Sequence, residues 1–342
     1  MATYQAQEQL SGISIAASPT PIPSLLPSGM GFHGDHELNL VDLELLHNFT
    51  TSTFATLSSD HLVRDVWRIT AVRLGVQCDY VMRSILAVSA LHIAHHRPDK
   101  REFYFSRALN YHQMASRTAT PLLGNLATSR DGWEHLYLFS TLTVFFSLGS
   151  TKQPDIIHAQ AFPPWIYLLS GSKSLIRLAW VRIEEYEGPL APLFKHGKRR
   201  WDRFHQLDNT FPMAKELVEL EERIIRSVLD PMSQAIYVRA IHDLARNMYV
   251  FNSRDMNCLP DITDAFVWVF EDMDPFLSHL RAQTQESLVI MAHFGTMLRM
   301  LESQWWLEGW SFLLLAKAWD TLDDEHRLWV QWPIEQVGWI PP

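Results

Sequence analysis

Cysteine is almost missing from this chain, which has only Cys78 and Cys258 among its 342 residues. Two thiols cannot build a disulfide framework or a thiolate metal cluster, so the sequence predicts a protein of a reducing compartment. The first residues also lack the basic and apolar regions of a secretory signal peptide. We therefore expect an intracellular protein and assign it to the cytoplasm.

Long apolar runs and excess positive charge are missing as well. The segment LFSTLTVFFSL at 138–148 is shorter than the ~20 residues that span a bilayer, so we expect no membrane span. The formal net charge is −9, whereas a nucleic-acid surface needs clustered Lys and Arg. The basic run KHGKRRWDR at 195–203 is short, and we interpret it as a solvated connector. We expect no direct DNA binding.

Alternating strand patterns and glycine-rich phosphate loops do not occur. Apolar residues instead recur at spacings of three and four, as in amphipathic helices. The hydrophobic fraction of 47%, with 13 Trp and 18 Phe, provides for a large core. The sequence predicts an all-α fold: one helical domain over 39–342, enclosing an apolar cavity, after a Pro- and Ser-rich flexible leader at 1–38. The predicted helices are 40–57, 79–96, 101–118, 131–148, 163–185, 212–229, 232–252, 261–282, 285–303 and 305–322.

Five stretches together resemble a known family. They are DLELLHNFTTSTFATL, ILAVSALHIAHHRP, SLVIMAHFGTML, WWLEGW and EHRLWVQWPIEQVGW, in this order from residue 42 onward. They are similar to the C-terminal regulatory domain of fungal zinc-cluster transcription factors of the sterol-uptake-control type. The resemblance implies an all-helical fold with an interior pocket, which holds a sterol in the sterol-responsive members.

One departure from that family concerns DNA binding. The family places a six-cysteine, two-zinc cluster ahead of the regulatory domain, whereas residues 1–38 contain no cysteine. Zinc held by thiolates needs those ligands. We therefore expect this chain not to bind DNA in the family's way, and its pocket could serve another purpose. A further resemblance is to the non-canonical humulene synthases of fungal secondary metabolism, which are helical class I cyclases without the usual aspartate-rich motif.

Metal ligands are hard to name in this sequence. Glu271, Asp272 and Asp274 crowd together, but Pro275 prevents them from sharing one continuous helical face. The run LHIAHH at 91–96 brings histidines together without a carboxylate or thiolate to complete a ligand set. We interpret both as structural. A magnesium ion, expected from the resemblance to a cyclase, therefore has no predicted ligands.

The most unusual segment is WWLEGWSFLLLAKAWD at 305–320, which is apolar around most of a helix. On a helical wheel Trp306, Trp310, Leu313 and Lys317 share one face. The resemblance to humulene synthases implies a lysine at the diphosphate site, one turn after an aliphatic pocket residue. We therefore predict that Lys317 is catalytic and that Leu313, Trp310 and Trp306 line the substrate pocket. The alternative is an ordinary lysine near a helix end.

Two functions compete on this basis. The first is a non-canonical class I sesquiterpene cyclase that converts farnesyl diphosphate, an apolar isoprenoid substrate, to a cyclic hydrocarbon, with the lysine and Mg²⁺ stabilising the departing diphosphate. The alternative is a sterol- or lipid-sensing regulator-like protein that lacks its DNA-binding domain and acts through protein partners. We favour the enzyme.

Overall fold

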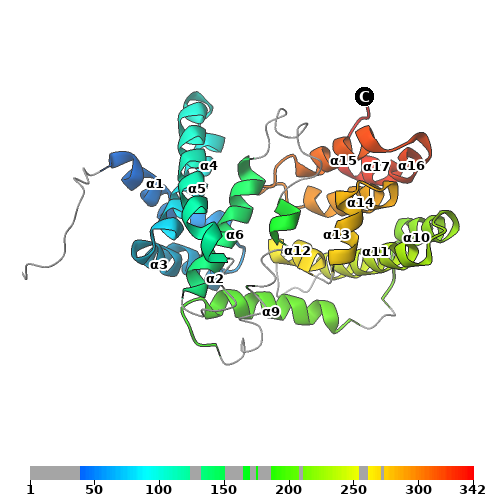
Figure 1. The fold of residues 1–342 in the computed structure, drawn as a ribbon, viewed down its shortest axis with the longest axis horizontal. Coiled ribbons are helices and arrows are strands. Elements are labelled where there is room, and N and C mark those ends of the chain that lie inside the picture. Colours follow the sequence, from blue (N-terminus) through cyan, green and yellow to red (C-terminus); the bar gives the residue numbers. More distant parts are fainter. Residues whose placement is uncertain are drawn as a thin grey trace, which may run out of the picture. The chain divides into compact units, whose positions relative to one another are not determined.

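The computed structural model describes residues 39–123, 132–150, 165–169, 175, 186–207, 211–253, 261–270 and 273–342. Every long element in these ranges is a helix and none is a strand (Figure 1). The predicted all-α fold class is therefore confirmed. None of the described helices is both long enough and apolar enough to cross a membrane.

The helices follow one another with short connections. The first part of the chain forms α1 (Leu40–Thr51), η1 (Thr53–Thr56), α2 (His61–Asp65), η2 (Val66–Ala71), α3 (Val72–Gln77), α4 (Asp79–His96), η3 (Pro98–Lys100), α5 (Arg101–Leu123) and α6 (Trp133–Ser150). The second part forms α9 (Ala191–His205), α10 (Lys215–Ser227), α11 (Pro231–Asn252), α12 (Ile262–Phe270), α13 (Asp274–Arg281), α14 (Gln285–Arg299), α15 (Trp310–Thr321), α16 (Asp324–Trp329) and α17 (Gln331–Val337).

Two helices form the centres of the packing. In α4 all residues from Ser84 to Ala94 are buried, and α1, α3, α5 and α6 pack around it. In α14 all residues from Ser287 to Leu298 are buried, and α11, α13, α15, α16 and α17 surround it. A helix that is apolar on every side has no face for water, so it must occupy the middle of a core.

The helices from Leu40 to Pro342 belong to one compact unit. The leader predicted at 1–38 lies outside the described residues, and its flexibility stays a prediction. Most of the helix predicted at 163–185 lies outside them too. The predicted domain and its apolar cavity also stay predictions.

Two predicted helices are shorter than expected. The segment 261–282 is divided into α12 and α13, and Pro275 occupies the first turn of α13, where its missing N–H costs nothing. The predicted helix 305–322 begins only at Trp310, after Gly309 with φ +81°. Glycine adopts this left-handed conformation without strain, so the chain can turn there before the helix starts.

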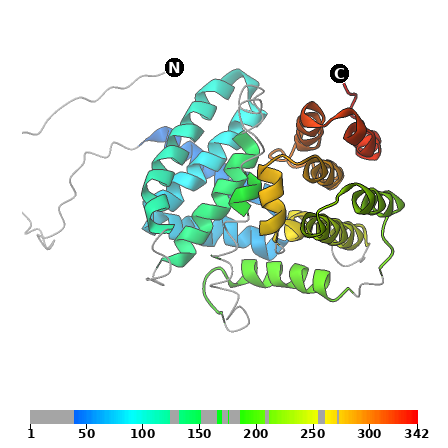
Figure 2. The ribbon, with the colours of Figure 1, turned by 45° about the vertical axis from the view of Figure 1, so that its right-hand side comes forward.

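The basic run at 195–203 is helical, which corrects its interpretation as a connector. It lies in α9, which packs against α2, α11 and α12 (Figure 2). Phe194 and Phe204 are buried on one side of α9. These aromatic side chains give the run an apolar face, so burial holds the segment as a helix despite its charge.

Buried histidines should make the stability of this fold depend on pH. His293 in α14 is 1% exposed, and burial lowers its pKa from 6.5 to about 4. Because the folded pKa lies below the unfolded value, the stability from neutral His293 is complete above pH 6.5 and is lost as the pH falls toward about 4. We expect a loss on the order of 3 kcal/mol from this residue.

The test is urea unfolding at several pH values between neutrality and pH 4. His293→Leu should flatten the decline in the free energy of unfolding over this window, whereas His47→Leu, at an exposed position, should leave its slope unchanged. Equal slopes for wild type and His293→Leu would contradict the expectation.

Candidate functional site

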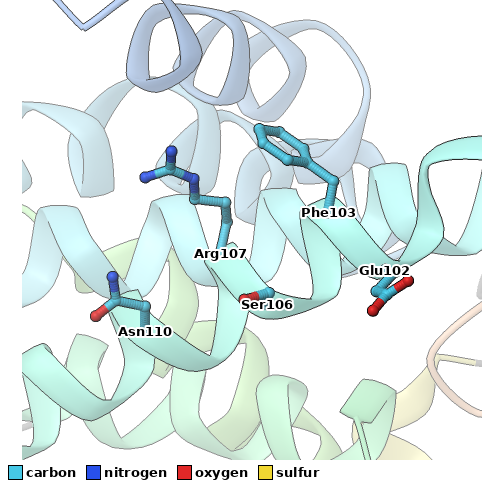
Figure 3. Close-up of a pocket in the computed structure, with 5 residues that line it drawn as sticks. All are labelled: Glu102, Phe103, Ser106, Arg107 and Asn110. Atoms are coloured by element: carbon cyan, nitrogen blue, oxygen red, sulfur yellow. The ribbon is translucent and has the colours of Figure 1, made fainter.

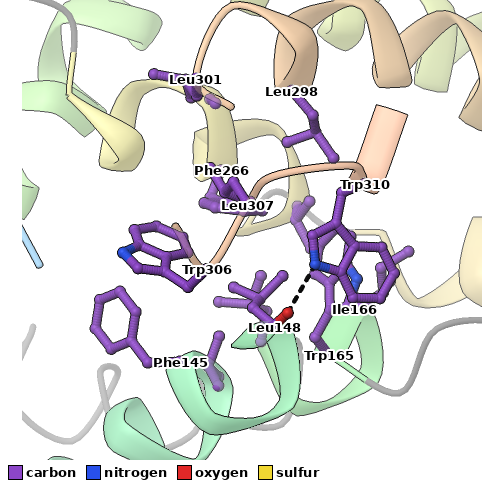
Figure 4. Close-up of a cluster of buried hydrophobic side chains, with 14 of the residues drawn as sticks. Phe145, Leu148, Trp165, Ile166, Phe266, Leu298, Leu301, Trp306, Leu307 and Trp310 are labelled. Carbon is purple, nitrogen blue, oxygen red and sulfur yellow. Dashed lines mark hydrogen bonds between the residues drawn. The ribbon is translucent and has the colours of Figure 1, made fainter. Parts of the chain in front are cut away.

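Three tryptophans connect the two groups of helices. The indole N–H of Trp305 donates to Thr56 Oγ1 at 3.0 Å, and that of Trp306 donates to the Thr56 carbonyl at 3.0 Å. The N–H of Trp310 donates to the Leu148 carbonyl at the end of α6 at 2.9 Å (Figure 4). Each buried donor thus has an acceptor in the N-terminal group, meaning the helices from α1 to α6 that pack around α4. The WWLEGW segment therefore fixes that group against α15.

The turn between α14 and α15 is stabilised by Glu302. One carboxylate oxygen accepts from Ser311 N at 2.9 Å and from Ser311 Oγ at 2.6 Å. The other accepts from Arg299 Nη1 at 2.7 Å. The carboxylate therefore satisfies a free N–H in the first turn of α15 and closes the turn that carries Trp305 and Trp306.

Of the four residues that were predicted to share one helical face, the structure separates Trp306 from the other three. Trp306 precedes α15 and is buried in the core, where its ring meets Phe145 at 4.8 Å between centroids (Figure 4). Trp310 begins α15 and is also buried. Leu313 and Lys317, further along α15, are half-buried. The shared face therefore exists only for Trp310, Leu313 and Lys317.

Lys317 lies in the last turns of α15, one turn before its end at Thr321. Burial lowers the pKa of its ammonium group, and the neighbouring Asp320 carboxylate opposes this shift. This environment fits the alternative of a lysine near a helix end, whose charge interacts favourably with the last carbonyls. Its role as a site residue stays a prediction.

A surface depression of about 540 Å³ lies on α5 (Figure 3). The described residues that line it are Glu102, Phe103, Ser106, Arg107 and Asn110. The depression is open to solvent, and charged groups belong to its lining. It does not contain any of the residues predicted to line a substrate pocket.

The histidine run at 91–96 lies at the junction between the helices around α4 and the WWLEGW segment, where the tryptophans also bind. His92 Nδ1 lies 2.9 Å from Thr53 Oγ1, and its ring packs on Trp305 at 5.1 Å between centroids. Burial lowers the pKa of His92 to about 4, with smaller contributions from His95 and His96.

Within the described ranges no three His, Cys, Asp or Glu side chains are arranged to hold a metal, and magnesium stays a prediction without ligands. Glu271 and Asp272 lie outside those ranges.

A second polar cluster is buried where α2, α9 and α12 meet. Asp261, just before α12, is 1% exposed. One of its oxygens accepts from Ser58 Oγ at 3.0 Å, from Ser59 N at 2.7 Å and from Ser59 Oγ at 2.6 Å. Burial alone would raise the pKa of Asp261, but nearby His196 and the hydrogen bonds from Ser59 and Thr263 lower it well below its usual value.

The side chains that face these acidic groups come from the buried side of α9. His196 lies between two carboxylates: its Nδ1 is 3.1 Å from Asp60 Oδ2 and its Nε2 is 3.6 Å from Asp261 Oδ1. One turn later the buried Arg200 forms an ion pair with the buried Asp264. Asp60 also caps α2 by accepting from the backbone N–H groups of its first turn.

This cluster holds helices together rather than presenting reactive groups. Its serine hydroxyls donate to a carboxylate and not to an imidazole, so no activated nucleophile is formed. Sequence reasoning missed the cluster because it interpreted 195–203 as a connector. The spacing of Phe194, Trp201 and Phe204, at i, i+7 and i+10, was a signal of a buried helical face.

Comparison with known proteins finds similarity to fungal transcription factors. Residues 44–201, slightly under half of the chain, match the family described as the fungal specific transcription factor domain. A Zn(2)-C6 fungal-type transcription factor of Gibberella zeae is 21% identical over 325 residues, which cover 88% of this chain and 62% of the relative. The Zn(2)-C6 fungal-type transcription factor afumD of Aspergillus fumigatus is 26% identical over 142 residues, which cover 41% of this chain and 37% of the relative.

These comparisons correct the predicted activity. The sesquiterpene cyclase and lyase assignment is wrong, because the matching family and both relatives are transcription factors. The resemblance to humulene synthases and the isoprenoid ligand have no support. The comparisons do not test the roles of Lys317, Leu313, Trp310 and Trp306 as site residues. The resemblance to the regulatory domain of fungal transcription factors is supported. The chain spans less than two thirds of each relative.

The Trp310 hydrogen bond should contribute measurably to stability. Trp310→Phe removes the N–H and leaves the buried Leu148 carbonyl without this donor, so we expect a loss of about 1–3 kcal/mol in the free energy of unfolding. Trp332→Phe is the control, because it makes the same change in a half-buried ring that packs on His293 in α14. Denaturant unfolding of both variants checks this, and equal losses would contradict a special role for the junction.

The Arg200–Asp264 pair should be sensitive to the loss of one partner. Arg200→Met leaves a buried carboxylate without its cation, and we expect a cost of about 3–5 kcal/mol. The neighbouring Arg199 has a side chain that is 66% exposed and lies 3.6 Å from Asp60. Arg199→Met should therefore cost at most about 1 kcal/mol. Thermal unfolding that lowers both midpoints equally would contradict this assignment.

Proposed function

We propose that this chain is a regulatory domain of a fungal transcription factor, which acts in the nucleus by contacting protein partners. The match of residues 44–201 to the fungal specific transcription factor domain carries the proposal. This range begins in α1 and ends in α9, so it contains the helical group around α4 and the helix that joins this group to α11 and α12.

The geometry is in keeping with such a role. At both helix junctions polar side chains contact segments distant in sequence: Trp305 donates to Thr56, Trp310 donates to Leu148, and Arg200 pairs with Asp264. A helical body held by such contacts is suited to present surfaces to other proteins. The lipid-sensing part of the alternative stays a prediction from sequence resemblance.

DNA recognition under this proposal comes from another module or polypeptide. A Zn(2)-C6 cluster, after which the relatives are named, needs six thiolates. The 342 residues contain two cysteines. The domain would thus modulate transcription at promoters to which a separate DNA-binding module or polypeptide recruits it.

The test is to tether the domain to a promoter. The described unit from Leu40 to Pro342 is fused to a heterologous DNA-binding module in a fungal host that carries a reporter with the matching operator. We expect reporter transcription to rise or fall at least about threefold relative to the DNA-binding module alone, a change that a regulatory contact worth a little under 1 kcal/mol would produce.

Val88→Asp is the matched negative control for this assay. Val88 is fully buried in α4, so an unpaired carboxylate there should disrupt the core and abolish the effect. Immunoblotting and microscopy establish that the wild-type fusion is present in the nucleus. Unchanged reporter transcription at that level of nuclear protein would refute the proposal.

A further inference from the structure

The solvent-facing side of α9 differs in charge from the rest of the molecule. With histidine taken as neutral, the helix contains five Lys or Arg residues and one acidic residue, a net +4 for the whole helix within a chain of net −9. Arg200 is turned inward to Asp264. The other four basic residues are Lys195, Lys198, Arg199 and Arg203, and Asp202 is the acidic one.

Three of these basic residues form a row along the helix. Lys195, Arg199 and Arg203 are four residues apart, so their side chains follow one another on the same face at intervals of about 6 Å. Lys195 and Arg199 are exposed, and Arg203 is half-buried and donates to the Ser253 carbonyl. Like charges at this spacing destabilise a helix. The row therefore lowers the stability of α9, and a role in binding would explain why it is present.

The opposite side of α9 fixes the direction in which this row points. Phe194 and Phe204 are buried, His196 lies beside carboxylates from the segments before α2 and before α12, and Arg200 contacts a carboxylate in α12. The helix therefore cannot rotate without breaking a buried ion pair. The cations are held in place before a partner arrives, which reduces the entropy lost on binding.

We propose that this basic face of α9 is a docking surface for an acidic protein segment in which carboxylates alternate with apolar residues. Such segments are typical of disordered transcriptional activation regions, and this identification of the partner rests on the proposed function. Charge complementarity selects the ligand class, because in an extended segment the carboxylates at alternate positions share one face about 6.6 Å apart, close to the spacing of the row.

Nucleic acid fits this surface less well. A protein that binds duplex DNA through its backbone makes several phosphate contacts over an extended basic surface. Here the positive charge is confined to one face of a single helix, with Asp60 lying 3.6 Å from Arg199 and Asp202 lying 2.7 Å from Lys198. These carboxylates repel phosphates and peptide carboxylates alike, so the extent of the basic surface decides: backbone binding of a duplex needs several contacts over a wide area, whereas a short acidic peptide needs only the row itself.

The experiment measures binding of a fluorescein-labelled synthetic peptide of about 16 residues in which Asp and Glu alternate with Leu and Phe. Fluorescence anisotropy with the full chain should show saturable binding that weakens as salt is added. Lys195→Ala/Arg199→Ala should lower the affinity about tenfold, because it removes two cations of the row. Lys195→Ala alone should cause a smaller loss in the same direction.

The matched control is Lys215→Ala/Arg226→Ala, which removes two exposed cations from α10, each in an i, i+4 ion pair. It makes the same change in net charge and should alter the affinity less than about twofold. Equal losses in both double variants, or no binding by wild type, would overturn the proposal. Stronger displacement of the peptide by duplex DNA than by unlabelled peptide at equal charge would assign the surface to nucleic acid instead. This assay does not depend on the promoter-tethering result, so either proposal can fail alone.

Discussion

The arrangement of helices depends on the indole N–H bonds of Trp305, Trp306 and Trp310. Each N–H would lose its water on burial and must find an acceptor. All three acceptors belong to the N-terminal group, at Thr56 and Leu148. The helices around α14 can therefore bury the aromatic rings only when they are in register with the helices around α4. Apolar packing alone would not impose this register, because hydrophobic contact has no direction.

The buried charges at α9 add a second constraint of the same kind. Arg200 faces Asp264, and His196 lies between carboxylates from segments distant in sequence. The Arg200 guanidinium left without its partner in the interior would be costly. Such pairs contribute little net stability compared with apolar groups of equal size, but they exclude alternative positions of the helix. The outward-facing basic row is a consequence of this fixed orientation.

Much of the fold followed from helical periodicity, and its failures have physical causes. Positions 305–309 fit a helical wheel as well as α15 does, but Gly309 and the Glu302 carboxylate make them a turn. The run 195–203 was wrongly predicted to be a connector, because its many charged residues suggested a solvated loop although the flanking aromatic residues are buried on one side of a helix. The wrong function has another origin: it followed from the resemblance to humulene synthases and from the missing cysteine cluster, and the similarity to transcription factors overturned it. A segment rich in Trp and Leu could not decide between the two functions, because it has the same pattern whether it lines a cavity or fills a core.

The hydrogen bonds of Trp305, Trp306 and Trp310 also show why the donors of this contact can be recognised in the sequence and the acceptors cannot. The donors are tryptophans, and the motif WWLEGW stands out because few other side chains combine a large apolar ring with one N–H. Two of the three acceptors are backbone carbonyls, of Thr56 and Leu148. Every residue has a carbonyl, so these positions have no sequence signature and can change side chain without losing the bond. The sequence therefore shows that these tryptophans need hydrogen-bond acceptors, but only the structure shows which backbone carbonyls accept.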